Sequence, residues 1–158
     1  MKNLEIERKF LINKVTWNSH EKPAGVKYCQ GYLGIDADKI IRVRVAGDKG
    51  FLTIKGKSAT FSHPEFEYSI PYDEALELIS KFTGRQVEKV RYRIPCGSHV
   101  FEVDEFSGMN EGLTIAEIEL SSPEEAFDKP EWLGEEVTGD ARYYNANLSL
   151  HPFVEWEK

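Results

Sequence analysis

The sequence offers few residues of the kinds that cross-link a small protein or hold a structural metal. Two of its 158 residues are cysteines, Cys29 and Cys96, which lie far apart and form no Cys-x-x-Cys pair. The sequence therefore indicates neither a disulfide framework nor a zinc site, and we expect buried thiols. Four histidines stand apart from one another and from the cysteines, so we expect structural or surface roles for them: His20, His63, His99 and His151.

Long apolar runs and an excess of basic charge are also missing. No segment approaches the roughly 20 apolar residues of a membrane span, and the charged stretch 1–9 does not resemble a signal peptide. The formal net charge of -7 argues against a general nucleic-acid binder. A content of 41% hydrophobic residues is enough for one core, so we expect a single domain over 1–158. We expect a cytoplasmic protein without nucleic-acid or membrane partners.

Turn residues separate many short segments of alternating character, which predicts strands with two or three helices inserted. From Tyr72 to Phe82 the apolar residues recur at helical spacing, with Asp73 as a cap and Gly84 just beyond the end. We therefore expect an amphipathic helix over 72–82 with one buried face.

Two further helices are predicted in the last third of the chain. One begins at Ser122, where Ser-Pro-Glu-Glu supplies an N-cap, a first-turn proline and a capping-box partner, and it ends near Pro130. The other is short, begins at Asp140 and extends to about Leu148. The form of the segment 153–156 is left open.

Charged and apolar residues alternate through at least seven predicted strands. In the first strand, Glu5, Glu7 and Lys9 share one face, because successive side chains point to opposite sides. The same parity groups polar residues in later strands: Arg42 with Arg44, Thr53 with Lys55, Glu65 with Glu67, Lys89 with Arg91 and Arg93, Glu102 with Asp104, and Glu117 with Glu119. In each strand the opposite face is apolar.

This alternation has two interpretations. An antiparallel sheet with one solvated face shows it without any function. The density of Arg, Lys and carboxylates, with each sign clustered by strand, favours a binding surface instead. We therefore predict an α+β protein: a closed or nearly closed antiparallel β-barrel of about eight strands, with a charged lumen and with helices flanking its apolar outer face.

Such a lumen suits an anion that arrives with a divalent cation, and polyphosphate with magnesium has that character. Guanidinium and ammonium groups bind phosphate oxygens, and five side chains are predicted to do so: Lys9, Arg42, Arg44, Lys55 and Arg91. Carboxylates are the hard oxygen ligands that Mg²⁺ or Mn²⁺ prefers, and five are predicted to bind the metal: Glu5, Glu7, Asp104, Glu117 and Glu119. Other hydrolase and nucleotide-binding motifs are absent: there is no Gly-x-Ser-x-Gly, and Phe51 occupies the first glycine position of a Walker motif.

The ordered motifs resemble the CYTH superfamily, or triphosphate tunnel metalloenzymes, whose hallmark Glu-x-Glu-x-Lys matches Glu5, Glu7 and Lys9. The resemblance covers residues 3 to about 148 and includes these segments: Gln30-Gly31-Tyr32-Leu33, Arg42-Val43-Arg44, Thr53-Ile54-Lys55-Gly56, Glu88-Lys89-Val90-Arg91-Tyr92, Ala116-Glu117-Ile118-Glu119 and Glu136-Val137-Thr138. The short bacterial branch is most similar. That branch implies a tunnel of about eight antiparallel strands and metal-dependent hydrolysis of inorganic triphosphate.

The resemblance also implies catalytic roles. Lys89 matches a lysine that positions or activates the attacking water, and Tyr32 matches a tyrosine proposed as a proton acceptor. A structural role for Tyr32, held by a hydrogen bond in the barrel, stays open. The roles of Glu65 and Glu67 are left open, as is self-association into a homodimer.

Three rival functions follow from the same pattern. A second branch of the superfamily makes cyclic AMP from ATP, thiamine triphosphate is another candidate substrate, and a polyphosphate-binding module would use the cations alone. Because the carboxylates have no evident use in holding an anion, we favour an enzyme in which water attacks a terminal phosphorus in line.

Overall fold

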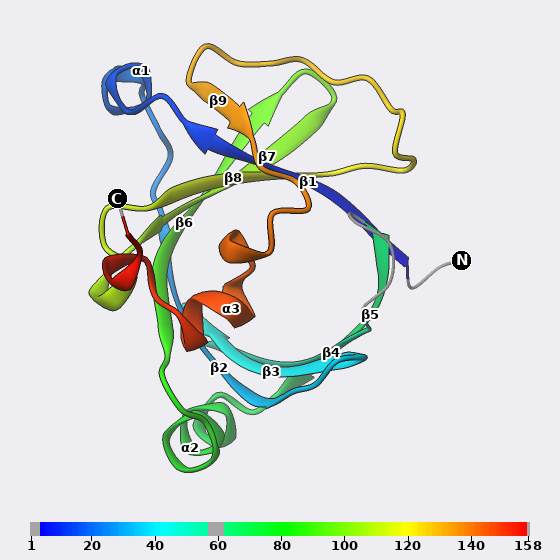
Figure 1. Ribbon diagram of the computed structural model, residues 1–158, viewed down its shortest axis with the longest axis vertical. Helices are drawn as coiled ribbons and strands as arrows, with labels where there is room; N and C mark the ends of the chain where they lie inside the picture. Colours follow the sequence, from blue (N-terminus) through cyan, green and yellow to red (C-terminus); the bar gives the residue numbers. More distant parts are fainter. Residues whose placement is uncertain (1–3, 57–61, 158) are drawn as a thin grey trace.

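Eight antiparallel strands form a closed barrel in the computed structural model, which describes residues 4–56 and 62–157 (Figure 1). Around the ring, the order is β5-β4-β3-β2-β6-β7-β8-β1, and pairing of β5 with β1 closes it. The strands are β1 (Leu4–Ile12), β2 (Val26–Ile35), β3 (Lys39–Ala46), β4 (Lys49–Gly56), β5 (Ser62–Ile70), β6 (Val87–Cys96), β7 (His99–Phe106) and β8 (Thr114–Glu119). The predicted barrel is confirmed.

The strand β1 is the junction of the barrel. One of its edges pairs with β8, from Glu7 to Leu11. The other edge is divided, because its first residues pair with β5 whereas Phe10 and Ile12 pair with β9 (Leu133–Glu136). The closing contact with β5 spans the three residue pairs Leu4–Pro64, Glu5–His63 and Ile6–Ser62. This short β1–β5 pairing is hereafter the seam.

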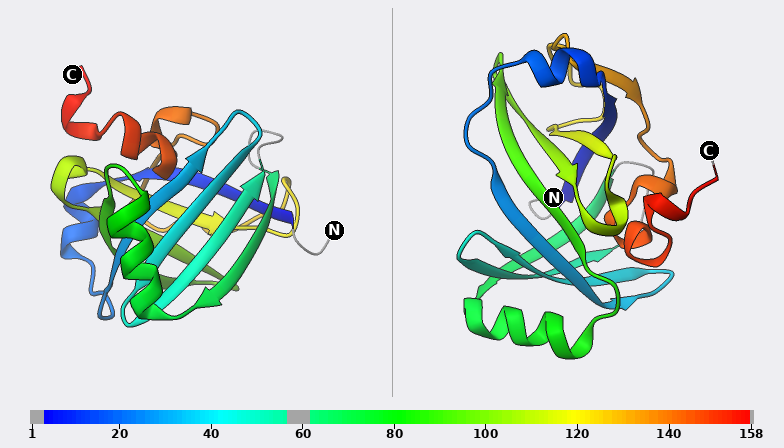
Figure 2. Two further views of the ribbon diagram at one scale, coloured as in Figure 1. Left: turned by 90° about the horizontal axis from the view of Figure 1, so that it is seen from below. Right: turned by 90° about the vertical axis from the view of Figure 1, so that its left-hand side faces the viewer.

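The apolar core lies outside the ring rather than inside it. The helix α2 (Tyr72–Phe82) packs along the outer face of β2, β3 and β4 (Figure 2), where Ala75 and Ile79 contact Val43 and Val45. On another part of the wall, Trp17 of α1 (Lys14–Ser19) joins an aromatic and aliphatic cluster built on β1, β6, β7 and β8. Burying these outward side chains leaves the opposite face of every strand for the lumen.

Of the three predicted helices, α2 has the predicted bounds, whereas the other two differ from the prediction. The helix predicted from Ser122 to Pro130 is wrong: 121–124 forms bends and turns, and 125–130 has no regular structure. Glu125 does reach back to a backbone N–H, that of Ser121, but its other oxygen contacts His99. Phe127 packs edge-to-face on Phe10 of the outer cluster, so side-chain packing draws the chain out of a helix.

The helix predicted from Asp140 is divided into two short elements. Asp140 caps the 3-10 turn η2 (Ala141–Tyr143), Tyr144 is extended with ψ 133°, and α3 (Asn145–Leu150) follows. Viewed along the barrel, α3 lies within the outline of the ring (Figure 1). The 3-10 turn η3 (Phe153–Glu155) occupies the segment that was left open, and η1 (Gly108–Asn110) follows β7. The prediction also missed α1, which Asn13 caps.

None of the described helices is long and apolar enough to cross a membrane.

Candidate active site in the lumen

The barrel encloses a cavity of about 580 Å³, and the described residues that line it include equal numbers of carboxylate and cationic side chains. Seven carboxylates line it: Glu5, Glu7, Glu65, Glu67, Glu102, Glu117 and Glu119. Seven cationic side chains line it as well: Lys9, Lys55, Lys89, Arg42, Arg44, Arg91 and Arg93. The strand parity that placed these residues on one face is therefore confirmed. Asp104 shares this face but does not line the cavity, as described below.

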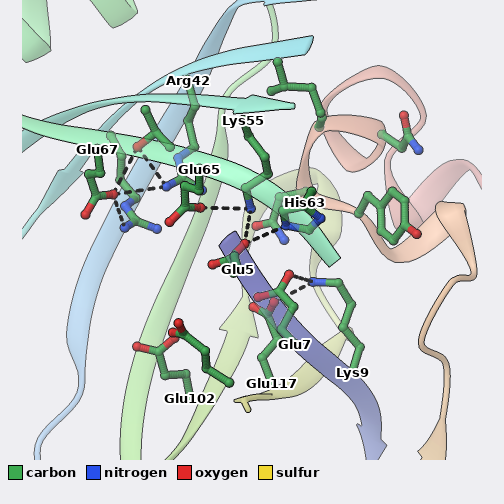
Figure 3. Close-up of a pocket in the computed structure, with 18 of the residues that line it drawn as sticks. Glu5, Glu7, Lys9, Arg42, Lys55, His63, Glu65, Glu67, Glu102 and Glu117 are labelled. Carbon is green, nitrogen blue, oxygen red and sulfur yellow. Dashed lines mark hydrogen bonds and ion pairs between the residues drawn. The ribbon is translucent and has the colours of Figure 1, made fainter. Parts of the chain in front are cut away.

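On the β3–β4–β5 wall, two arginines share one carboxylate. Arg42 and Arg44 each approach Glu67 Oε2, at 3.4 and 3.2 Å, and the Thr53 hydroxyl donates to the same oxygen at 3.0 Å (Figure 3). Both guanidinium Nε atoms are buried without a hydrogen-bond partner among the described residues. Burial, and then repulsion from Arg42 and Arg91, lowers the pKa of Arg44 to about 10. Each arginine therefore keeps one buried donor, Nε, without a described partner.

At the seam, Glu5 lies between a histidine and a lysine. Its Oε1 atom is 2.6 Å from His63 Nε2 and 3.1 Å from Lys55 Nζ, and Lys55 also contacts Glu65 at 3.3 Å (Figure 3). Burial alone would raise the pKa of Glu5, but the hydrogen bond from His63 and the charge of Lys55 lower it to about 2. Glu5 is therefore ionised at neutral pH.

The neighbouring carboxylate Glu7 has the opposite character. Burial, and then the negative charge of Glu117, raises its pKa to about 8. Lys9 is 3.7 Å from Glu7 but 2.6 Å from Glu117 (Figure 3). Burial would raise the pKa of Glu117, but Lys9 and Arg91 hold it well below its usual range. Lys9 thus neutralises Glu117 and leaves Glu7 without adequate positive charge.

Asp104 lies beneath the side chains that line the lumen and is not itself exposed to the cavity. Its two oxygens accept hydrogen bonds from Arg91 Nε and Nη2, each at 2.8 Å, and Lys89 Nζ is 2.9 Å away. Burial opposes ionisation, but Lys89 and Arg91 lower the pKa of Asp104. Asp104 was predicted as a metal ligand; in this structure its oxygens bind these two cations, and the metal role stays a prediction.

Lys89 is 2% exposed and lines the lumen. Burial lowers its pKa to about 7, although Asp104 opposes this shift. Tyr32 also lines the lumen, and its hydroxyl accepts a hydrogen bond from Gln30 Nε2 at 2.8 Å. This contact is compatible with both the structural and the catalytic interpretation of Tyr32, so its role stays a prediction.

One cluster has the composition of a metal site. Ligand atoms of Glu5, Glu7 and His63 all lie within 4.8 Å of one another. The donor set fits a divalent cation, because a bound cation would supply the positive charge that Glu7 lacks, and carboxylate oxygens are the ligands that Mg²⁺ and Mn²⁺ prefer. Glu119, another predicted ligand, also lines the lumen, and burial together with Glu5 raises its pKa.

His63 was expected to be a structural or surface residue, yet it lies in this cluster. Strand parity contained the signal, because positions 63, 65 and 67 share one face of β5 and all three side chains line the lumen. The isolation of His63 in sequence concealed its proximity to Glu5, which is its partner in the seam register.

The fold and the lumen together define a tunnel-like barrel with a mixed-charge interior. The CYTH domain model matches residues 3–147, and the chain belongs to the CYTH domain family.

Two curated relatives match nearly the whole chain. An inorganic triphosphatase of Acetivibrio thermocellus is 48% identical over 155 residues, which is 98% of each chain. An inorganic triphosphatase of Nitrosomonas europaea is 40% identical over 151 residues, covering 92% of this chain and 97% of that one.

Solved structures agree with this assignment. A crystal structure of an inorganic triphosphatase superposes with a TM-score of 0.66 at 37% identity, covering 92% of this chain and 94% of that one. A protein of Pyrococcus horikoshii, at 22% identity and a TM-score of 0.58, covers 76% of this chain and 81% of its own, and shows the fold alone.

Proposed function

We propose that this protein hydrolyses the terminal phosphate of inorganic triphosphate inside the barrel, with Mg²⁺ or Mn²⁺ as its cofactor. The observation that carries the proposal is the enclosed lumen with equal numbers of cationic and carboxylate side chains on its described wall. The two curated relatives, named inorganic triphosphatases, support the same substrate class.

The charge balance explains why the substrate would bring a metal. A wall with as many carboxylates as cationic side chains provides little excess positive potential for a linear triphosphate, which carries several negative charges. A divalent cation bound by carboxylates offsets those charges and leaves the guanidinium and ammonium groups to bind phosphate oxygens. This argument favours an enzyme over a binding module, because a module would need the cations without the carboxylates.

We assign phosphate binding to the five predicted cations: Lys9, Lys55, Arg42, Arg44 and Arg91. The contacts that Arg42 and Arg44 make with Glu67 are longer than 3 Å, so phosphate oxygens can replace or supplement the carboxylate as their partner. Lys55 occupies the corresponding position beside Glu5 and Glu65.

We assign the metal first to Glu5 and Glu7, with His63 beside them, and then to the other predicted carboxylates on the wall, Glu117 and Glu119. When bound, the metal supplies positive charge that polarises phosphoryl oxygens and offsets the charge of the transition state. Because Glu7 must lose its proton to act as a ligand, metal affinity is expected to increase with pH.

For the chemical step, we assign to Lys89 the orientation of the attacking water. Asp104 restrains its Nζ atom from beneath the lumen surface, and a pKa lowered to about 7 lets the amine accept a proton near neutral pH. Tyr32 lies on the same wall as a second proton acceptor or as a structural group. Attack in line on the terminal phosphorus requires no covalent intermediate.

The test is release of phosphate from tripolyphosphate, ATP and thiamine triphosphate with magnesium, manganese or EDTA, with cyclic AMP measured in parallel. We expect metal-dependent phosphate release from tripolyphosphate, and its loss in Glu7→Ala and Glu119→Ala. Glu131→Ala, which removes an exposed carboxylate outside the lumen, is the control. Cyclic AMP with pyrophosphate would instead indicate a cyclase, and tight binding without turnover would indicate a binding module. A homodimer and a cytoplasmic location also stay predictions.

A further inference from the structure

The C-terminal segment places one amide among the buried groups of the lumen. Asn145 is the first residue of α3, and its Oδ1 atom accepts a hydrogen bond from Lys89 Nζ at 2.8 Å. The same oxygen accepts a second hydrogen bond from Gln30 Nε2 at 3.3 Å, and Gln30 Nε2 also donates to the Tyr32 hydroxyl. One side-chain oxygen therefore connects the two residues to which catalytic roles were assigned.

The position of Asn145 is fixed by packing rather than by the hydrogen bonds alone. Ala146 and Leu148 of α3 are 5% and 1% exposed. Leu148 belongs to the same buried cluster as Val87, which lies two residues before Lys89 on β6. Because α3 is anchored to the strand that carries Lys89, the amide is held in register with the ammonium group.

Lys89 needs such a partner, because a lysine side chain has four rotatable bonds and only its end group reacts. Asp104 restrains Nζ from one side, but it also accepts both hydrogen bonds from Arg91. An ammonium has three donors. With Asp104 and Asn145 as the described hydrogen-bonding partners of Nζ, its third position is left for a water in the lumen: a donor in the ammonium form and a lone pair in the neutral amine.

We propose that Asn145 is a positioning residue: it fixes Lys89 Nζ, and through Gln30 the Tyr32 hydroxyl, in the arrangement that the hydrolysis requires. This proposal rests on the proposed function. It gives the C-terminal segment a part in the site that the strand pattern does not predict, and it makes Gln30, which is 0% exposed, the buried connector.

The test compares two nearly isosteric replacements. Asn145→Leu removes the acceptor, whereas Asn145→Asp keeps an oxygen in its place. We expect Leu to lower kcat for tripolyphosphate by about tenfold or more with KM within about threefold, since misplacing a reacting group affects turnover more than binding. We expect Asp to retain at least about a third of kcat at its own pH optimum. Each variant is compared at its own optimum, because a carboxylate beside Lys89 changes the pH range in which the amine is protonated.

Asn147→Ala is the matched control, because it removes an amide from the same helix. Its Nδ2 atom donates to the Ala141 carbonyl at 2.7 Å, so the change loosens α3 without removing an acceptor from Lys89. An Asn145→Leu enzyme with unchanged kcat would overturn the proposal. So would equal losses in Asn145→Asp or Asn147→Ala, or a rise in KM alone.

A second measurement separates this proposal from the proposed function. If the parent protein releases no phosphate, the proposed function fails, and the contact is then tested by the ¹⁵Nζ NMR signal of Lys89, assigned by its loss in Lys89→Met. A buried, hydrogen-bonded ammonium exchanges its protons slowly. We expect Asn145→Leu to shift or broaden this signal and Asn147→Ala to preserve it, whereas an unchanged signal in Asn145→Leu would refute the contact.

Discussion

Replacement of Glu7 by glutamine is expected to stabilise the metal-free protein at alkaline pH while it abolishes turnover. Glu7 is a buried carboxylate beside Glu117, and Lys9 makes its short contact with Glu117 instead. Without a bound cation, its ionisation opposes folding. Glutamine has a similar shape and carries no charge, so it removes this opposition together with the predicted metal ligand.

The sign and size follow from the pKa of Glu7, which is about 8 in the folded protein against 4.5 for the ordinary group. Between these values the folded protein holds a proton that the unfolded chain has lost, so stability falls as pH rises through this window. Between about pH 5.5 and pH 8 the loss is about 3 kcal/mol from this group, at about 1.4 kcal/mol per pH unit. The glutamine variant lacks this contribution.

The assay is urea denaturation in EDTA at the two pH values, for the parent, Glu7→Gln and the exposed control Glu131→Gln. The stability advantage of Glu7→Gln over the parent should be about 3 kcal/mol larger at the alkaline value, and Glu131→Gln should follow the parent. Identical pH dependence in Glu7→Gln and the parent would refute the reasoning, because it would mean that Glu7 ionises in the folded lumen as easily as in water.

Three other changes test the wall, the core and the reacting amine. Arg44→Lys should raise KM for tripolyphosphate by about tenfold with little effect on kcat, since an ammonium lacks the planar fork that binds two phosphate oxygens; steady-state kinetics would show it, and an unchanged KM would remove Arg44 from substrate binding. Trp17, 1% exposed and packed edge-to-face on Trp132, lies outside the lumen; Trp17→Ala should lower the free energy of unfolding by about 3–5 kcal/mol, measured by urea denaturation, and a loss below about 1 kcal/mol would contradict its core position. Because the pKa of Lys89 in the folded protein is about 7, kcat should fall as pH drops below that value. The Lys89→Arg variant should lose this pH dependence. A flat pH–rate profile in the parent would exclude proton acceptance by Lys89.

Strand parity alone predicted most of the lumen. Alternation of side chains across a strand does not depend on how the sheet curves, so a charged face predicted for Arg42 and Arg44 stays a charged face in the barrel. The outward apolar face needs a cover, and the helical spacing of 72–82 identified one part of it, with the bounds that α2 has. Local periodicity was therefore sufficient to predict both the charged residues that line the lumen and the bounds of α2.

Strand parity could not predict how deeply a side chain is buried or which residues from distant segments meet. Asp104 has the predicted parity, but the longer side chains of Lys89 and Arg91 bind its oxygens and separate it from the lumen. His63 meets Glu5 across strands that lie 58 residues apart in sequence. Asn145 comes from a helix, where strand parity does not apply. Each of these positions depends on a tertiary contact that no local pattern contains.

The seam is a short pairing that closes the barrel next to the predicted metal site. Three residue pairs close the ring, and one of them, Glu5 with His63, belongs to the cluster whose composition suits a divalent cation. A cation held there would tie together β1 and β5, the two strands whose short pairing closes the ring. Saturation at about 100 times the dissociation constant would then stabilise the closed ring by about 2.7 kcal/mol. Local opening at the seam would become rarer as the cation concentration rises. The ion that serves the reaction would therefore also stabilise the closed barrel.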